Sequence, residues 1–305
     1  MKQFATVIIF TLLSIGAVVA QDNANILSAP PTPNRTIEGN GFEVDLYFGS
    51  LKQGRVGLIG LRGDIVRAQA TVFNRRVDFF SVPDRDGYYA LIAARTDQPI
   101  RVYELIVAVE LSNNTTANLS IGIDITNGGF ISSEVTLPPD DELLALLDPQ
   151  IEEDELAFLF ETTTPITEVV LWGREGFIAP VNAALTSPFG AVRTFNETYL
   201  SVHTGWDFQA GIGRPMVAAA GGRIVFEGQL PLRGNYILID HGRGVYSGYA
   251  HLSVSYVTQG QAVTTGQVLG LVGTTGRSSG AHSHIEFIVN NEWVDAADFI
   301  QMYIP

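Results

Sequence analysis

The stretch Gly276-Arg277-Ser278-Ser279-Gly280-Ala281-His282-Ser283-His284-Ile285-Glu286 is a glycine- and serine-rich turn that runs into alternating residues. In an extended chain, side chains two positions apart project from the same face, so we expect His282, His284 and Glu286 to line one surface of a strand. Two imidazoles on one face can share a metal ion. A single His-x-His pair is also compatible with two surface histidines, so the rest of the chain must decide between the two interpretations.

All five histidines of the protein fall in its last third: His203, His241, His251, His282 and His284. The segment His203-Thr204-Gly205-Trp206-Asp207 places a carboxylate four residues after the first of these imidazoles. Two imidazoles and one carboxylate can hold zinc and leave a coordination position open for water, as catalytic zinc sites do. The same three donors also describe the facial triad of non-haem iron oxygenases.

Three motifs follow one another: H-x-G-x-D from His203, Tyr-Ala-His-Leu around His251, and G-x-S-x-G-x-H-x-H ending at His284. In this order they resemble the lysostaphin/LytM-type zinc metallopeptidases, which cut peptide bonds in bacterial cell-wall peptidoglycan. The resemblance extends roughly from Trp172 to the C-terminus. It implies that His203, Asp207 and His284 bind Zn²⁺ and that His251 and His282 are the catalytic pair.

Three further residues have roles that the resemblance does not assign uniquely. Tyr199 is a candidate substrate-binding residue, because some relatives aim a tyrosine at the transition state, although a packing role is the alternative. We interpret His241 as structural, supporting a turn or bonding a backbone carbonyl. Glu286 either orients a ligand or pairs with a cation.

The resemblance implies a secreted zinc-dependent endopeptidase that hydrolyses peptide cross-links of bacterial peptidoglycan. One alternative is a catalytically silent or weak cell-wall-binding activator of other hydrolases, because some members of the family have lost ligands. All of the ligand positions are kept here, which counts against this alternative. The second alternative is a non-haem iron oxygenase. The wide H-x-x-x-D spacing and the two additional histidines favour the zinc hydrolase over it.

The composition of the chain and the pattern of its N-terminal residues indicate where the protein acts and which partners it can bind. The formal charge of −14 on 305 residues argues against nucleic acid and anionic membranes as partners, and the absence of cysteine rules out disulfides. Residues 1–20 have a lysine, an apolar run and a small residue before Gln21, the pattern of a secretory signal peptide. We therefore expect a secreted, periplasmic or cell-wall-associated bacterial protein, with membrane attachment only if this segment is not cleaved.

The remaining chain divides into four expected parts. Residues 21–40 are a proline-rich linker, and residues 41–137 contain short apolar runs between turn residues, which predict an immunoglobulin-like β-sandwich without catalytic groups. Residues 138–170 predict a helical connector, because Asp140 and Asp148-Pro149 are helix starts. We assign the acidic residues 152–155 to the helix dipole. The resemblance implies that residues 171–305 form an antiparallel β-sheet metallopeptidase domain, and a fragment from about Thr167 is expected to fold alone.

Overall fold

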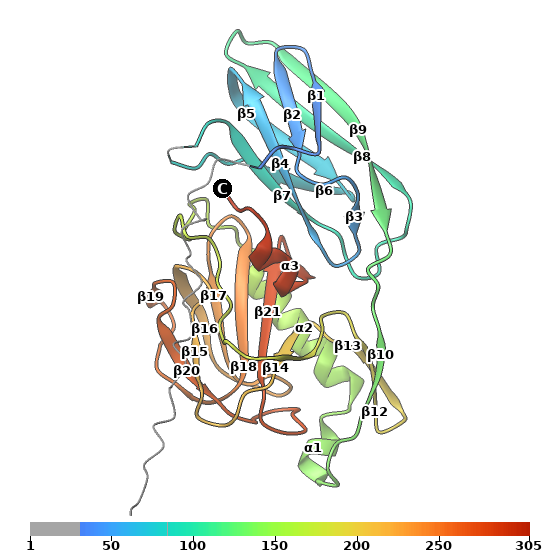
Figure 1. Ribbon diagram of the computed structural model, residues 1–305, viewed down its shortest axis with the longest axis vertical. Coiled ribbons are helices and arrows are strands. Elements are labelled where there is room, and N and C mark those ends of the chain that lie inside the picture. The colour runs from blue at the N-terminus through green and yellow to red at the C-terminus, as the bar shows by residue number, and fades with distance from the viewer. Residues whose placement is uncertain (1–30, 84) are drawn as a thin grey trace, which may run out of the picture.

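The structure is a computed structural model that describes residues 31–83 and 85–305. Its described part consists of an N-terminal β domain stacked on a C-terminal β domain, with a helical segment between them in the chain (Figure 1). The mostly-β class, the sandwich, the helical connector and the antiparallel C-terminal sheet were predicted correctly. The predicted signal segment, residues 1–20, lies outside the described residues. Within the described residues, no helix has the length and apolar character needed to cross a membrane.

The N-terminal domain is a sandwich of two sheets. Strand alternation builds its core: in β8 the side chains of Leu105, Val107 and Val109 are buried, while the residues between them are exposed or half-buried. The first sheet has the order β1 (Arg35–Glu38), β2 (Phe42–Leu46), β4 (Val56–Gly63), β7 (Tyr88–Ala93). The second has the order β3 (Leu51–Lys52), β9 (Thr116–Thr126), β8 (Val102–Leu111), β5 (Ile65–Val72), β6 (Arg75–Asp78).

Two segments differ from the expected division of the chain. Strand β1 lies within the predicted linker of residues 21–40, but it pairs antiparallel with β2 as part of the sandwich. Strand β10 (Ser132–Val135) lies within residues 41–137, but it pairs in parallel with β12 (Val192–Phe195), which pairs in turn with β13 (Tyr199–Val202). Pairing with a distant strand leaves no local signal in the sequence. The sandwich sheets therefore end at Thr126, and the next strand belongs to the C-terminal half.

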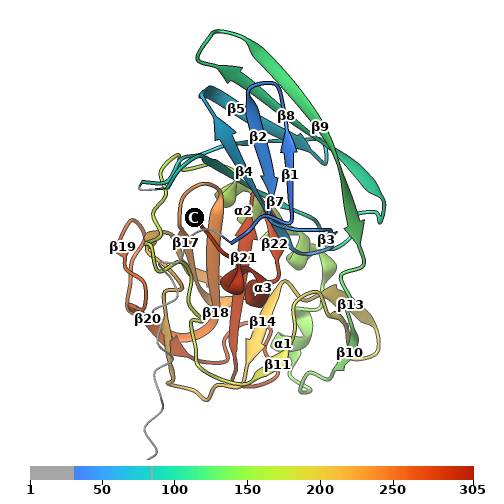
Figure 2. The same ribbon diagram turned by 45° about the horizontal axis from the view of Figure 1, so that its top comes forward.

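The helices of the connector begin where their caps predict. The Asp140 carboxylate accepts hydrogen bonds from the backbone of Glu142 and Leu143 at the start of α1 (Asp141–Ala145). Asp148 caps α2 (Pro149–Thr163), with proline in the first helical turn. In Figure 2, α2 lies behind strands of the C-terminal sheet, and its buried Leu159 packs in one cluster with Leu230 and Tyr236 of that sheet.

The C-terminal domain is built on one large antiparallel sheet. The register between neighbouring strands places Asp207 of β14 opposite His284 of β21, and His284 opposite Ala250 of β18. The three motifs therefore meet on adjacent strands. The sheet order is β11 (Leu185–Ser187), β14 (Gly205–Phe208), β21 (Ser283–Val289), β18 (Val245–Ser255), β17 (Gly234–Asp240), β16 (Gly222–Leu230), β19 (Ala262–Val263). Strands β15 (Pro215–Val217), β20 (Val268–Val272) and β22 (Glu292–Val294) pair beside this path, and α3 (Ala296–Gln301) follows.

The two domains share a buried apolar cluster. Phe80 of the N-terminal domain packs edge-on against Trp172, with ring centroids 6.0 Å apart, and both side chains are buried. At the rim, Arg55 forms an ion pair with Asp298. The C-terminus ends between the domains (Figure 1), where the indole N–H of Trp172 donates to the Pro305 carbonyl at 3.0 Å. The domains consequently pack as one unit rather than as two bodies on a tether.

Candidate metal centre

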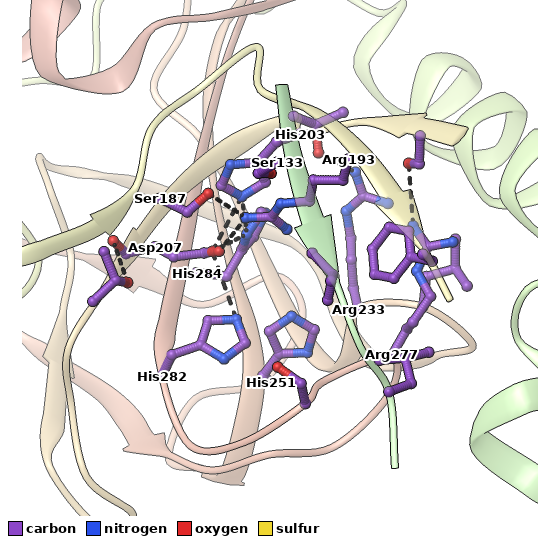
Figure 3. A pocket seen from close by; sticks show the side chains of 18 of the residues that line it. Ser133, Ser187, Arg193, His203, Asp207, Arg233, His251, Arg277, His282 and His284 are labelled. Carbon is purple, nitrogen blue, oxygen red and sulfur yellow. Dashed lines mark hydrogen bonds and ion pairs between the residues drawn. The ribbon is translucent and has the colours of Figure 1, made fainter. Parts of the chain in front are cut away.

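Three side chains from different parts of the sheet converge at one point (Figure 3). His203 lies in the turn between β13 and β14, while Asp207 and His284 face each other across β14 and β21. The Nε2 atom of His203 lies 3.1 Å from Oδ1 of Asp207 and 3.1 Å from Nδ1 of His284. The third distance, from His284 Nδ1 to Asp207 Oδ1, is 2.8 Å. All three residues are buried.

The hydrogen-bond partners assign the protons of the two rings. Nδ1 of His203 lies 2.7 Å from the Pro188 carbonyl, which can only accept, so this nitrogen carries the hydrogen and Nε2 presents a lone pair. Nε2 of His284 lies 3.3 Å from the Glu286 carboxylate, so in the neutral ring Nδ1 is the lone-pair atom. Two lone pairs and a carboxylate oxygen thus face one another in a buried space.

This donor set fits a zinc ion. Zinc takes imidazole nitrogen and carboxylate oxygen at about 2.0–2.1 Å in tetrahedral geometry, which separates the ligand atoms by about 3.3 Å. The three observed separations of 2.8 to 3.1 Å are close to that value. A cation at their centre would turn a repulsive contact between three electron-rich atoms into an attractive one.

A second pair of histidines lies beside the first cluster. His251 of β18 has its ring centroid 4.8 Å from that of His282. Nδ1 of His251 donates to the Thr275 carbonyl at 2.7 Å, and Nδ1 of His282 donates to the Gly280 carbonyl at 2.8 Å. The Nε2 atoms are therefore lone-pair atoms, and that of His282 lies 3.6 Å from Asp207 Oδ1. The donor atoms of His251, His282 and His284 also lie within 4.8 Å of one another.

Burial controls the charge of these groups. It lowers the pKa of His203 to about 4, the pKa of His251 well below its ordinary value, and that of His282 as well. Burial would also lower the pKa of His284, but the Asp207 and Glu286 carboxylates outweigh it and raise that pKa. For Asp207, burial acts upward, and the contacts to His203 and His284 nevertheless hold its pKa well below the usual range. At neutral pH, His251 and His282 are consequently neutral and able to accept a proton.

Two arginines that the sequence analysis did not single out support the carboxylates. Arg193 of β12 forms an ion pair with Oδ2 of Asp207 and donates to Ser187 Oγ at 2.8 Å. Asp207 therefore turns only Oδ1 toward the histidines. Arg233 donates to both oxygens of Glu286, at 2.6 and 2.8 Å. No local pattern around either arginine indicates these contacts.

Glu286 realises both of the roles expected for it. Its carboxylate is fully buried, pairs with Arg233, and accepts from the Tyr236 hydroxyl at 2.9 Å and from Thr204. The same carboxylate lies beside Nε2 of His284. Burial would raise the pKa of Glu286, but Arg233 and His284 keep it well below its usual value. Glu286 thus fixes the ring of His284 from the side away from the cluster.

A cavity of about 470 Å³ opens over the histidines. One of its walls comes from Ser133 and Val135 of β10 together with Glu152 of the connector helix α2. In Figure 3, β10 crosses the front of the cavity near Arg233. The assignment of the acidic residues 152–155 to the helix dipole is incomplete: Glu152 lies in the first turn of α2, and its carboxylate also pairs with Arg277 at 2.9 Å and helps line the cavity.

Tyr199 and His241 lie apart from the cluster. The Tyr199 hydroxyl donates to Glu152 at 2.8 Å, and the ring lies 5.5 Å from the Arg277 guanidinium. Its substrate-binding role stays a prediction, because Tyr199 is not among the described residues that line the cavity. His241 is buried, and its Nδ1–H bonds the Gly221 carbonyl at 2.7 Å, in agreement with a structural role.

Fold and donor set together define a two-domain β protein whose C-terminal domain has the His/Asp arrangement of a metallopeptidase. Residues 201–296 match the family model "Peptidase family M23". The chain therefore contains a peptidase M23 domain, in agreement with the family that the three motifs indicated.

Individual relatives extend this assignment. DD-carboxypeptidase/endopeptidase Mpg of Neisseria meningitidis is 42% identical over 129 residues, which cover 41% of this chain and 30% of that protein. Peptidoglycan DD-endopeptidase ShyA of Vibrio cholerae is 43% identical over 94 residues, covering 31% and 22%. The chain thus spans less than a third of the length of these relatives. A crystal structure from Pseudomonas aeruginosa, assigned to peptidase M23, superposes with a TM-score of 0.62 at 25% identity, covering 83% of this chain and 96% of the other.

Proposed function

We propose that this chain is a zinc-dependent endopeptidase that hydrolyses peptide cross-links of bacterial peptidoglycan. The observation that carries the proposal is the convergence of three potential metal-donor atoms, from His203, Asp207 and His284, beside the neutral pair His251 and His282. The relatives named above as DD-endopeptidases support the substrate class.

In this proposal, His203, Asp207 and His284 hold the zinc ion. When bound, zinc polarises a carbonyl oxygen and makes a bound water acidic enough to react near neutral pH. Arg193 holds Asp207 Oδ2, so Asp207 offers a single oxygen, Oδ1, to the ion. Glu286 holds Nε2 of His284, which keeps Nδ1 available as the ligand atom.

His251 and His282 carry the proton transfer. Each holds its Nδ1–H on a backbone carbonyl, so each accepts and releases a proton only at Nε2, the atom that faces the cluster. The Asp207 carboxylate lies near Nε2 of His282 and stabilises the imidazolium that forms there. The described residues contain no H-E-x-x-H motif, whose glutamate would act as the general base. A histidine is therefore the natural group to accept the proton of the attacking water.

Two features of the site favour hydrolysis over the alternatives. A catalytically silent activator does not need the complete donor set, whereas all three candidate ligands converge here. The facial triad of an oxygenase does not need the second histidine pair, whose lone-pair atoms are turned toward the same buried space. We further propose, from the pattern of residues 1–20, that the protein acts after export from the cytoplasm.

Digestion of defined cross-linked muropeptides tests the proposal. The full chain with zinc should convert dimers to monomers by adding one water, and mass spectrometry of the new amino and carboxyl termini identifies the bond that is cut. Intact dimers, together with faster cleavage by a second wall hydrolase when the chain is added, would instead support the activator.

A further inference from the structure

The turn between β16 and β17, residues 231–233 with Gly234 at the start of β17, contacts several parts of the proposed site. The Arg233 side chain binds both oxygens of Glu286, which bonds the proposed ligand His284. The Arg233 carbonyl accepts the backbone N–H of His251 at 2.8 Å. His251 has a φ of 57°, an uncommon conformation for a residue with a side chain, so this backbone hydrogen bond helps to hold it there.

The same turn is packed tightly against the loop that precedes His282. The Leu232 carbonyl accepts the backbone N–H of Arg277 at 2.9 Å. A Cβ placed on Gly234, which has a φ of 63°, would lie 2.3 Å from Thr275 Oγ1, and one on Gly276 would lie 2.4 Å from the Gly234 nitrogen. A displacement of this turn would therefore be transmitted to the loop and to the carbonyl of Thr275, which holds His251.

One side chain from outside the matched family region fixes this turn. Glu155 of α2 is 3% exposed, and its carboxylate accepts from Arg233 Nη1 at 2.6 Å and from the Leu232 backbone N–H at 2.7 Å. Arg233 thus lies between two buried carboxylates, Glu155 on the connector helix and Glu286 beside the site. The contact is non-local, since 78 residues separate Glu155 from Arg233.

We infer that Glu155 is a positioning residue for the metal centre, acting through Arg233 on Glu286 and His284 and through the turn on His251. The inference rests on the proposed function, because it assigns a role at that site. A buried ion pair is weak evidence for stability by itself, since the cost of desolvating both charges offsets their attraction. The geometry of the Arg233 contacts favours a positioning role. The guanidinium is planar, and its N–H donors are shared between Glu155 on the helix and Glu286, the carboxylate beside the proposed ligand His284.

Removing the Glu155 charge should act on the site more than on the fold. In Glu155→Gln the side-chain oxygen can still accept from Leu232, but Arg233 loses one of its two charged partners and is free to shift toward Glu286. The ring of His284 then loses its fixed orientation. Partners behind metal ligands typically change metal affinity or activity by about 10- to 100-fold when they are replaced.

The test uses the full chain and two matched variants. Glu155→Gln is compared with Glu153→Gln, which makes the same charge change at an exposed position of the same helix. Zinc affinity is measured by competition with a chromophoric chelator, the visible spectrum of the Co²⁺-substituted protein reports ligand geometry, and kcat and KM are measured on muropeptides. We expect Glu155→Gln to keep its secondary structure, to bind zinc at least about tenfold more weakly, to change the Co²⁺ spectrum and to lower kcat with little effect on KM. Glu153→Gln should match the unmodified chain in all of these measurements.

The outcomes separate the inference from the proposed function. Wild-type zinc affinity and Co²⁺ spectrum in a folded Glu155→Gln variant would overturn the inference and leave the proposed function standing. An unmodified chain that binds no zinc would overturn the proposed function itself. If Glu155→Gln does not fold, Arg233→Lys replaces it, because an ammonium group cannot serve both carboxylates with the fork geometry of arginine. A folded Arg233→Lys variant with unchanged zinc affinity would equally overturn the inference.

Discussion

The Nε2 atom of His203 lies 3.1 Å from the Nδ1 atom of His284, although 81 residues separate the two histidines in the chain. Each ring gives its hydrogen to an acceptor on its far side, the Pro188 carbonyl for His203 and the Glu286 carboxylate for His284. When both rings are neutral, the near atoms therefore face each other, and Asp207 Oδ1, with lone pairs only. A shared cation would relieve this repulsion.

The first prediction concerns metal content. The chain purified without chelator should contain about one zinc per molecule by elemental analysis, and His284→Ala should lose it because only two donors remain. His241→Gln is the matched control, since His241 is a buried histidine of the same domain that bonds Gly221 and Ser247 instead. Iron in place of zinc at one per chain would favour the oxygenase.

The second prediction separates the two overlapping donor groups. If the ion lies between His203, Asp207 and His284, then His251→Ala should keep zinc yet lose about 10²- to 10⁴-fold in kcat, the usual contribution of a positioned acid or base. Asp207→Ala should lose zinc. The opposite pattern, with zinc lost in His251→Ala and kept in Asp207→Ala, would place the ion in the second group, His251, His282 and His284.

The third prediction concerns the residue at which a stable fragment containing the C-terminal domain must begin. A fragment from Thr167, which the sequence alone suggests is independent, omits α2 with the buried Leu159 and Glu155. Leu159 packs in one cluster with Leu230 and Tyr236. A fragment from Asn127 keeps β10 and both connector helices, so it should be more stable than the Thr167 fragment by at least about 2 kcal/mol, the usual lower range for losing one buried leucine.

Urea unfolding and zinc competition on both fragments check this prediction. The Asn127 fragment should also retain zinc more strongly, because it keeps the contact between Glu155 and Arg233. Equal stability and equal zinc affinity of the two fragments would show that the connector contributes nothing to the domain.

The fourth prediction is a loss of stability in acid through His241. Burial lowers its pKa to about 4 in the folded protein, while an unfolded histidine titrates near 6.5. Below about pH 6.5 the unfolded state therefore binds the proton first, so the stabilisation present above that pH is lost as the pH falls toward 4. Between pH 7 and about pH 4.5 this costs about 2 to 3 kcal/mol.

The measurement compares His241→Gln with the unmodified chain by urea unfolding, with chelator present so that metal release does not contribute. The other buried histidines affect both proteins alike, so the difference between the two acid-induced losses isolates His241. The loss should be smaller by about 2 to 3 kcal/mol in the variant. Equal losses would mean that His241 is not held neutral in the folded chain.

The sequence by itself determined the local features of this protein. Asp140 and Asp148-Pro149 mark the helix starts because capping involves only neighbouring residues. The strands were recognisable from alternation, and the three motifs indicated the family because their spacing is a property of the chain.

Only the tertiary structure decided which distant groups meet. It paired β10 with β12 and brought Arg193 to Asp207. It also brought Glu155 to Arg233. Glu155 lies four residues before the apolar Leu159, a spacing that puts both side chains on the same face of a helix. No neighbouring residue indicates that Arg233 is the partner of Glu155. Such contacts depend on strand register and on packing between segments far apart in the chain. A buried charge needs a partner to offset its desolvation, and the order of residues in the chain does not reveal which group that partner is.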